Sequence, residues 1–184
     1  MAEQANGRAA VLLPGGGYTT DGPLLMFAAV AAQRRESYVH RVRWSPRGQQ
    51  EIHAWVVSEV EAALSESTAA SGVDSPLVIG KSLGSLAASV AAERGLPAMC
   101  FTPVLTDKPT AHALKRATAP CLLAGGTADT LWDGTIARSV TSRVVEIEGA
   151  DHGMFVPGDL AASAAVLGQV MTAVEQFLDD VVWR

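Results

Sequence analysis

The pentapeptide Gly80-Lys81-Ser82-Leu83-Gly84 has the pattern G-x-S-x-G and stands between a short apolar run and a helical segment. On a tight turn from a strand into a helix, a serine is held in a strained backbone conformation and its hydroxyl projects above the sheet. Glycines on both sides relieve the crowding in such a turn. The pattern alone also suits a serine that caps a helix, but its position predicts that Ser82 is a nucleophile.

A serine hydroxyl needs a base to take its proton and an acid to orient that base. His152 follows the last expected strand in the sequence Ala150-Asp151-His152-Gly153, and Asp129 follows the strand before it. Serine, acid and histidine therefore occur in the order that strand-to-helix loops require. We expect Ser82, Asp129 and His152 to form a catalytic triad, with Asp133 as the alternative acid and Asp151 as a turn residue.

The elements that must position these residues alternate along the whole chain. We expect strands at 9–13, 38–44 and 76–79, within 98–105 and 119–125, and at 143–148, and helices at 23–35, 49–67, 83–94, 131–139 and 160–180. This alternation predicts an α/β fold, a three-layer α/β/α sandwich with about six parallel strands. Parallel sheets place their sites at the carboxyl ends of the strands, where all three candidate side chains would lie.

The composition predicts one globular domain over residues 1–184, with a flexible start at 1–8. Hydrophobic residues make up 48% of the 184 residues and charged residues 18%, which excludes a disordered, collagen-like or disulfide-rich chain. The net charge of −5 argues against binding to nucleic acid or an anionic membrane. Cys100 and Cys121 lie in apolar runs, which predicts buried thiols, and without a secretory signal we expect a cytoplasmic protein.

Taken together, the motifs at Ser82, Asp129 and His152 resemble those of the α/β-hydrolases, from about Val11 to the end of the chain. Within that superfamily the sequence is similar to small, lidless dienelactone-hydrolase-like and testis-expressed-protein-30-like proteins. The resemblance implies a minimal α/β-hydrolase fold with the strand order 2-1-3-4-5-6. It implies no lid domain, because the segment 106–118 is too short for one. Dienelactone hydrolases use a cysteine where this chain has Ser82, so their own reaction does not follow.

The resemblance also implies an oxyanion hole. The segment Pro14-Gly15-Gly16-Gly17-Tyr18 follows the first strand, where the family has its glycine-rich oxyanion loop. By family position the donors would be the amide of Leu83 and the amide of Gly17 or Tyr18. If the fold is that of the family, the substrate pocket would be formed by Pro103, Trp132, Met154 and Phe155. Lys81 is expected to be a solvated side chain at the elbow, where it could favour anionic substrates.

These residues indicate a serine hydrolase that cleaves an ester, thioester or amide bond of a small or accessible acyl substrate through an acyl-enzyme, most simply a carboxylesterase. The alternative is a catalytically inactive α/β-hydrolase-fold binding or interaction module. No cofactor or metal is expected. Ser75 stands where a P-loop needs glycine, and Thr20 stands where a dinucleotide-binding loop needs its third glycine. The sequence does not indicate an oligomeric state.

Overall fold

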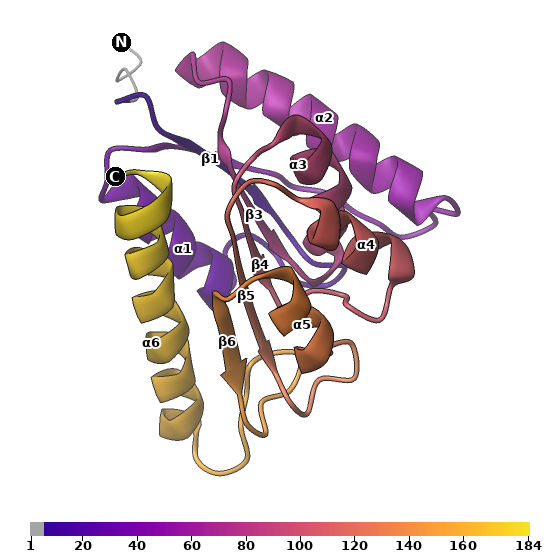
Figure 1. Cartoon of the computed structure of the whole chain (residues 1–184), viewed down its shortest axis with the longest axis vertical. Helices are drawn as coiled ribbons and strands as arrows, with labels where there is room; N and C mark the ends of the chain where they lie inside the picture. Colours follow the sequence, from indigo (N-terminus) through magenta and orange to yellow (C-terminus); the bar gives the residue numbers. More distant parts are fainter. Residues whose placement is uncertain (1–5) are drawn as a thin grey trace.

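A parallel sheet of six strands runs through the middle of the molecule in the order β2-β1-β3-β4-β5-β6 (Figure 1). The computed structural model describes residues 6–184, so most of the flexible start expected at 1–8 lies outside the described residues. The strands are β1 (Ala9–Leu13), β2 (Tyr38–Arg41), β3 (Leu77–Lys81), β4 (Ala98–Phe101), β5 (Cys121–Gly126) and β6 (Val144–Ile147). All neighbouring strands pair in parallel, which confirms the predicted class and strand order.

The inner strands are buried along their whole length because helices cover both faces of the sheet. Along β1, Ala10 and Leu12 pack against one layer of helices, and Val11 and Leu13 pack against the other. The edge strands β2 and β6 are only half-buried. The apolar runs that predicted strands are therefore the ones that fill the space between the two helical layers.

Two layers of helices complete the sandwich (Figure 1). One face is covered by α1 (Pro23–Gln33) and α6 (Leu160–Phe177), and the other face by α2 (Ile52–Ser71), α3 (Ala88–Arg94), α4 (Lys108–Arg116) and α5 (Gly134–Val140). A 3₁₀ turn, η1 (Ser82–Ala87), leads from β3 into α3, and a π-helical turn, η2 (Leu178–Val182), follows α6. Within residues 6–184, no helix combines the length and apolarity that crossing a membrane requires.

The clearest differences between the structure and the sequence prediction concern three elements. The strand expected at 38–44 ends at Arg41, and beyond it the Val42 amide makes one more hydrogen bond to β1, to the Leu12 carbonyl at 3.0 Å. The helix expected at 83–94 is divided into η1 and α3. The helix α4 was not expected; it begins where the Asp107 carboxylate accepts a hydrogen bond from the Thr110 amide at 2.9 Å. Because α4 packs on α3 and α5, the segment 106–118 belongs to the helical layer and is not a lid.

All six strands end at the lower edge of the sheet in Figure 1, and the loops that carry the candidate functional residues lie along this edge. Cys100 and Cys121 lie within the strands and are free, buried thiols, as the sequence predicts. Burial raises the pKa of the Cys100 thiol, so this residue stays protonated and apolar. The candidate catalytic residues Ser82, Asp129 and His152 all follow strand ends at this edge of the sheet.

Candidate active site

Ser82 occupies the sharp turn between β3 and η1 and has a left-handed backbone, with φ of 52°. The two neighbouring glycines make this turn possible. A Cβ atom on Gly80 would collide with the backbone of Gly84, and one on Gly84 would collide with the carbonyl groups of Leu13 and Pro14. The glycines of the G-x-S-x-G pattern are thus required by backbone-to-backbone packing, and they place the serine at the carboxyl edge of the sheet.

The side chain of Ser85 stabilises this turn through two hydrogen bonds. Its hydroxyl is completely buried, donates a hydrogen bond to the Ser82 carbonyl at 2.6 Å and accepts one from the Val104 amide at 3.1 Å. It therefore joins the elbow to the loop that follows β4. The sequence analysis missed this residue, because a serine in a small-residue helix carries no signal of its neighbours in space.

The structure brings Ser82, His152 and Asp129 into one chain of hydrogen bonds. The Ser82 Oγ lies 2.7 Å from the Nε2 of His152, and the Nδ1 of His152 lies 2.8 Å from the Oδ2 of Asp129. The second carboxylate oxygen of Asp129 accepts a hydrogen bond from the Leu131 amide at 2.9 Å. Because an ionised carboxylate only accepts, the proton of the imidazole sits on Nδ1, and Nε2 is left to accept the serine proton.

Close packing of two loops sets the distance between the acid and the histidine. A Cβ atom on Gly126 would collide with the backbone of Ala150, so the histidine loop lies directly against the end of β5. The Ala128 amide donates to the Ala150 carbonyl at 3.0 Å, and the Gly149 amide donates to the Thr127 hydroxyl at 2.8 Å. These contacts hold both loops in register, which brings Asp129 within reach of the imidazole.

The other two carboxylates near the site have structural partners. The Asp133 carboxylate caps α5 by accepting a hydrogen bond from the Ile136 amide at 2.8 Å. Asp151 accepts hydrogen bonds from the Gly153 and Phe155 amides and closes the histidine loop, as expected of a turn residue. The structure therefore places Asp129, and not Asp133, on the imidazole.

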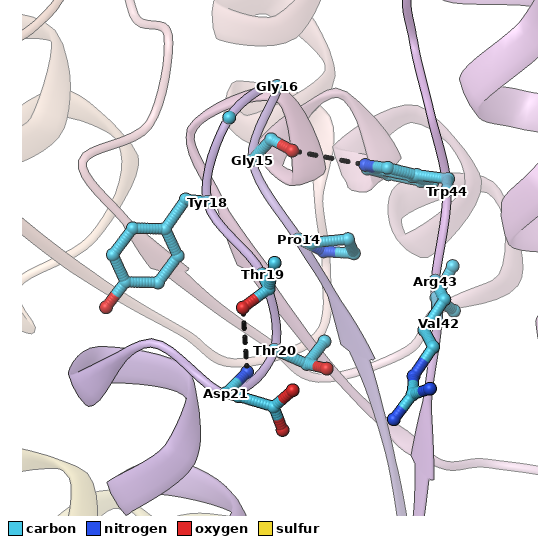
Figure 2. Close-up of a pocket in the computed structure, with 11 residues that line it drawn as sticks. Pro14, Gly15, Gly16, Tyr18, Thr19, Thr20, Asp21, Val42, Arg43 and Trp44 are labelled. Atoms are coloured by element: carbon cyan, nitrogen blue, oxygen red, sulfur yellow. Dashed lines mark hydrogen bonds between the residues drawn. The ribbon is translucent and has the colours of Figure 1, made fainter.

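The glycine-rich loop at 14–18 lies beside the turn that carries Ser82, and a hydrogen bond from Trp44 holds it in place. Trp44 donates from Nε1 to the Gly15 carbonyl at 3.2 Å across a pocket of about 380 Å³ between this loop and residues 42–44 (Figure 2). The Gly15 amide donates to the Tyr18 carbonyl at 2.8 Å, which tightens the turn. Gly17 and Tyr18 are thereby placed on a braced loop, with the Tyr18 ring turned away from Trp44 (Figure 2). Their role as oxyanion donors, together with Leu83, stays a prediction.

The four expected pocket residues separate into two groups. Met154 and Phe155 line an apolar cavity of about 330 Å³ between the histidine loop, the start of α1 and the start of α6. Pro103 is buried in the loop after β4. Trp132 is buried in the core beneath α4 and α5, where its ring packs on Gly125 and its Nε1 donates to Glu146 at 2.7 Å.

The cavity also includes residues that the sequence analysis did not single out. They come from the glycine-rich loop and from the first turns of α1 and α6, and they are Tyr18, Pro23, Leu24, Leu160, Ser163, Ala164 and Leu167. Leu160 is 75% exposed and Phe155 is 54% exposed, so apolar side chains stand at the rim of the cavity. An apolar helix turn that faces a site has the same sequence pattern as one that faces the core, which is why these residues gave no signal.

The expectation that Lys81 is solvated is wrong. Its side chain is buried, and its ammonium group donates to the His152 carbonyl at 3.1 Å and lies 5.0 Å from the centre of the Tyr18 ring. Burial lowers the pKa of this lysine from 10.5 to about 8, and the charges of Asp129 and Asp151 oppose that shift. A cation therefore lies inside the loop cluster that surrounds Ser82.

The chain is similar to solved structures at low sequence identity. A protein described as an α/β serine hydrolase without a lid, from Xanthomonas campestris, matches with a TM-score of 0.70 and 15% identity over 97% of this chain and 84% of that one. An α/β serine hydrolase homologue from Coxiella burnetii matches with a TM-score of 0.69 and 16% identity over 95% of this chain and 86% of that one.

A protein from Butyrivibrio proteoclasticus, solved with ferulic acid bound, matches with a TM-score of 0.72 and 12% identity over 100% of this chain and 94% of that one. No protein-family model matches the chain, and no curated protein matches its sequence. The likeness to the solved structures is therefore one of fold.

The two hydrogen bonds of the buried Ser85 hydroxyl should stabilise the folded chain. We expect Ser85→Ala to lower the free energy of unfolding by about 1–3 kcal/mol, because the half-buried Val104 amide loses its acceptor and the Ser82 carbonyl loses a donor. Ser89→Ala is the matched control, since the Ser89 hydroxyl donates to the Leu86 carbonyl one turn back in its own helical segment, and we expect it to stay within about 0.5 kcal/mol of the wild type. Urea unfolding followed by circular dichroism measures both, and equal effects would contradict this role of Ser85.

Proposed function

We propose that this chain, which has the α/β-hydrolase fold in its lidless form, is a serine hydrolase that acts on acyl substrates. The observation that carries the proposal is the chain of hydrogen bonds from Asp129 through His152 to Ser82, at 2.8 and 2.7 Å, on a turn where the serine has a left-handed backbone. Strain of this kind costs about 1–3 kcal/mol and persists only where the surroundings impose it. A serine that merely capped a helix would need neither the base nor the strain.

In the first half of the reaction, the Ser82 Oγ attacks the acyl carbonyl carbon while its proton moves to the Nε2 of His152. The electron pair of the carbonyl moves onto oxygen, where we place the amides of Leu83 and of Gly17 or Tyr18 as donors. The oxyanion then collapses, the bond to the leaving group breaks, and His152 returns the proton to the leaving oxygen, sulfur or nitrogen. Asp129 keeps the imidazole oriented and stabilises its charged form.

In the second half, a water molecule takes the place of the leaving group. His152 accepts a proton from this water, and the resulting hydroxide attacks the acyl carbon bound to Ser82. When the bond to Ser82 breaks, the proton returns to the serine oxygen and a carboxylic acid is released. Ester, thioester and amide substrates all fit this scheme, and a carboxylesterase is its simplest form.

The apolar cavity beside the histidine loop supports a substrate with a hydrocarbon acyl group. Its walls include Tyr18 of the oxyanion loop and Gly153, which directly follows His152, so the cavity opens next to the reacting groups. At about 330 Å³ it lies at the small end of the range for ligand pockets. Each methylene that enters it contributes about 0.8 kcal/mol of binding, which favours short to medium acyl chains.

A fluorophosphonate probe tests the triad. We expect it to label the wild type at one site, to leave Ser82→Ala unlabelled, and to react with Asp129→Asn about 10³ to 10⁴ times more slowly, because the imidazole loses the partner that fixes its tautomer. Asp133→Asn is the matched control and should label at the wild-type rate, since asparagine also caps a helix. Labelling rates are read from gel fluorescence, with circular dichroism to show folding.

A folded wild type that is not labelled would contradict the catalytic proposal and would favour a catalytically inactive module of the same fold. Faster labelling of Asp129→Asn than of Asp133→Asn would show that Asp129 is not the acid.

Ester substrates of increasing acyl length test the cavity. We expect kcat/KM to rise by up to about fourfold for each added methylene until the chain outgrows the cavity. Ala164→Phe, on the cavity wall, should lower kcat/KM for a hexanoyl ester by about tenfold or more and leave an acetyl ester unchanged. Ala165→Phe, exposed on the same helix outside the cavity lining, is the control. Equal effects of the two variants would show that the acyl group binds elsewhere.

A further inference from the structure

Lys81 is the last residue of β3 and directly precedes Ser82, yet its side chain takes no part in the proton transfers proposed above. The residue is only 3% exposed. Its Cδ lies against Gly15, where a Cβ atom would sit 3.5 Å away, so the stem of the side chain is packed beneath the glycine-rich loop. The ammonium group is therefore held between the loops that surround the nucleophile.

The cation contacts both of the loops that flank Ser82. On one side, its Nζ donates a hydrogen bond to the backbone carbonyl of His152 at 3.1 Å. On the other side, it lies 5.0 Å from the centre of the Tyr18 ring, within the range of a cation–π interaction. The Tyr18 hydroxyl in turn accepts a hydrogen bond from the Leu24 amide at 2.8 Å, which fixes the ring to the start of α1.

Burial of the Lys81 ammonium group is unfavourable for the free energy of folding. Its nearest charged neighbours are Asp129, whose carboxylate is already bonded to His152, and Asp151, whose carboxylate closes the histidine loop. Neither forms a salt bridge with Lys81 among the described residues. Burial of a cation without a paired anion lowers the stability of the fold, and an apolar chain of the same length would fill the same volume. The charge therefore needs an explanation other than folding.

We propose that the ammonium group of Lys81 is a positioning residue that ties the histidine loop and the oxyanion loop to the nucleophile elbow. It acts through His152 and Tyr18, without touching the substrate, and this role rests on the proposed function. A misplacement of about 1 Å in such groups can cost two orders of magnitude in rate. The tie holds the histidine loop and the glycine-rich loop at a fixed distance from each other, one on each side of Ser82.

The charge of Lys81 also gives the site a pH dependence. The groups that face the ammonium are Tyr18 from the oxyanion loop, Asp129 from the loop after β5, and Asp151 with the His152 carbonyl from the loop after β6. With a pKa of about 8, the ammonium loses its proton as the pH rises through that value. A neutral amine still donates to the carbonyl but loses its attraction to the ring and to both carboxylates, so the tie weakens.

Lys81→Met tests the proposal, with Lys115→Met, an exposed lysine at the far end of α4, as the matched control. We expect Lys81→Met to lower kcat for an acetyl ester by about tenfold or more, with KM changed by less than about twofold. The wild-type kcat should fall as the pH rises through about 8, and this fall should be absent in Lys81→Met. Lys115→Met should match the wild type in all three quantities.

The free energy of unfolding provides a readout that does not depend on activity. The pKa of Lys81 is about 8 in the folded chain and ordinarily 10.5, so the unfolded chain binds more protons between these values and the stability of the wild type rises with pH there. At pH 7, where the buried ammonium is charged, Lys81→Met should be at least as stable as the wild type. Its advantage should shrink between pH 8 and 10.5.

Each contrary outcome has its own meaning. A labelled wild type whose kcat equals that of Lys81→Met would overturn the positioning role while leaving the proposed function intact. A Lys81→Met that is both less stable and less active in proportion would show that the lysine only supports the fold. If Lys81→Met does not fold, the pH profile of the wild type tests the role instead, and a wild-type kcat that does not fall near pH 8 would overturn it. A folded wild type without labelling would overturn the proposed function instead, together with this role.

Discussion

The left-handed backbone at Ser82 is the constraint on which the rest of the site depends. A non-glycine residue rarely adopts this conformation, which costs about 1–3 kcal/mol and persists where the surrounding structure imposes it. Here the neighbours are main-chain atoms: Gly84 packs on the carbonyl groups that end β1, and Gly80 packs on Gly84. Because β1 and β3 are adjacent in the sheet, the strand order itself brings these atoms together. The position of Ser82 is thus fixed by the fold and not by its own side-chain contacts.

The remaining groups are placed by the same principle, one loop against the next along the carboxyl edge of the sheet. The histidine loop packs on Gly126 at the end of β5, which sets the position of the imidazole relative to Asp129. The glycine-rich loop is held by Trp44, which comes from the chain just after β2. Contacts between main-chain atoms leave little room for adjustment, so a site assembled this way is ordered before a substrate arrives. Such preorganisation is what electrostatic stabilisation of an oxyanion requires.

The features of this arrangement that follow from a local sequence pattern could be predicted from the sequence. Those that depend on contacts with distant segments could not. Apolar runs of strand length predicted the sheet, because inner strands must be apolar on both faces. The spacing of glycines around Ser82 predicted the elbow, because the turn has a steric requirement that only glycine meets. Lys81 was misread as solvated, since a lysine between a strand and a turn has the same local pattern whether or not another loop folds over it. The surroundings of Trp132 also depend on a distant neighbour, because its indole nitrogen donates a hydrogen bond to Glu146 on β6.

Where no lid covers a site, the walls of the cavity beside it must determine which substrate binds and must exclude water. In this chain the walls are the seam between α1 and α6 and the histidine loop, with Leu160 and Phe155 at the rim. A hydrocarbon chain lying in this seam would displace water from the side of the site that a lid otherwise covers, which strengthens the electrostatic interactions within it. The Tyr18 ring forms part of the wall of this cavity, and its centre also lies 5.0 Å from the Lys81 ammonium group. An apolar group bound in the cavity and the buried lysine would therefore both act on the same ring, because one would exclude water from it and the other would hold it in place.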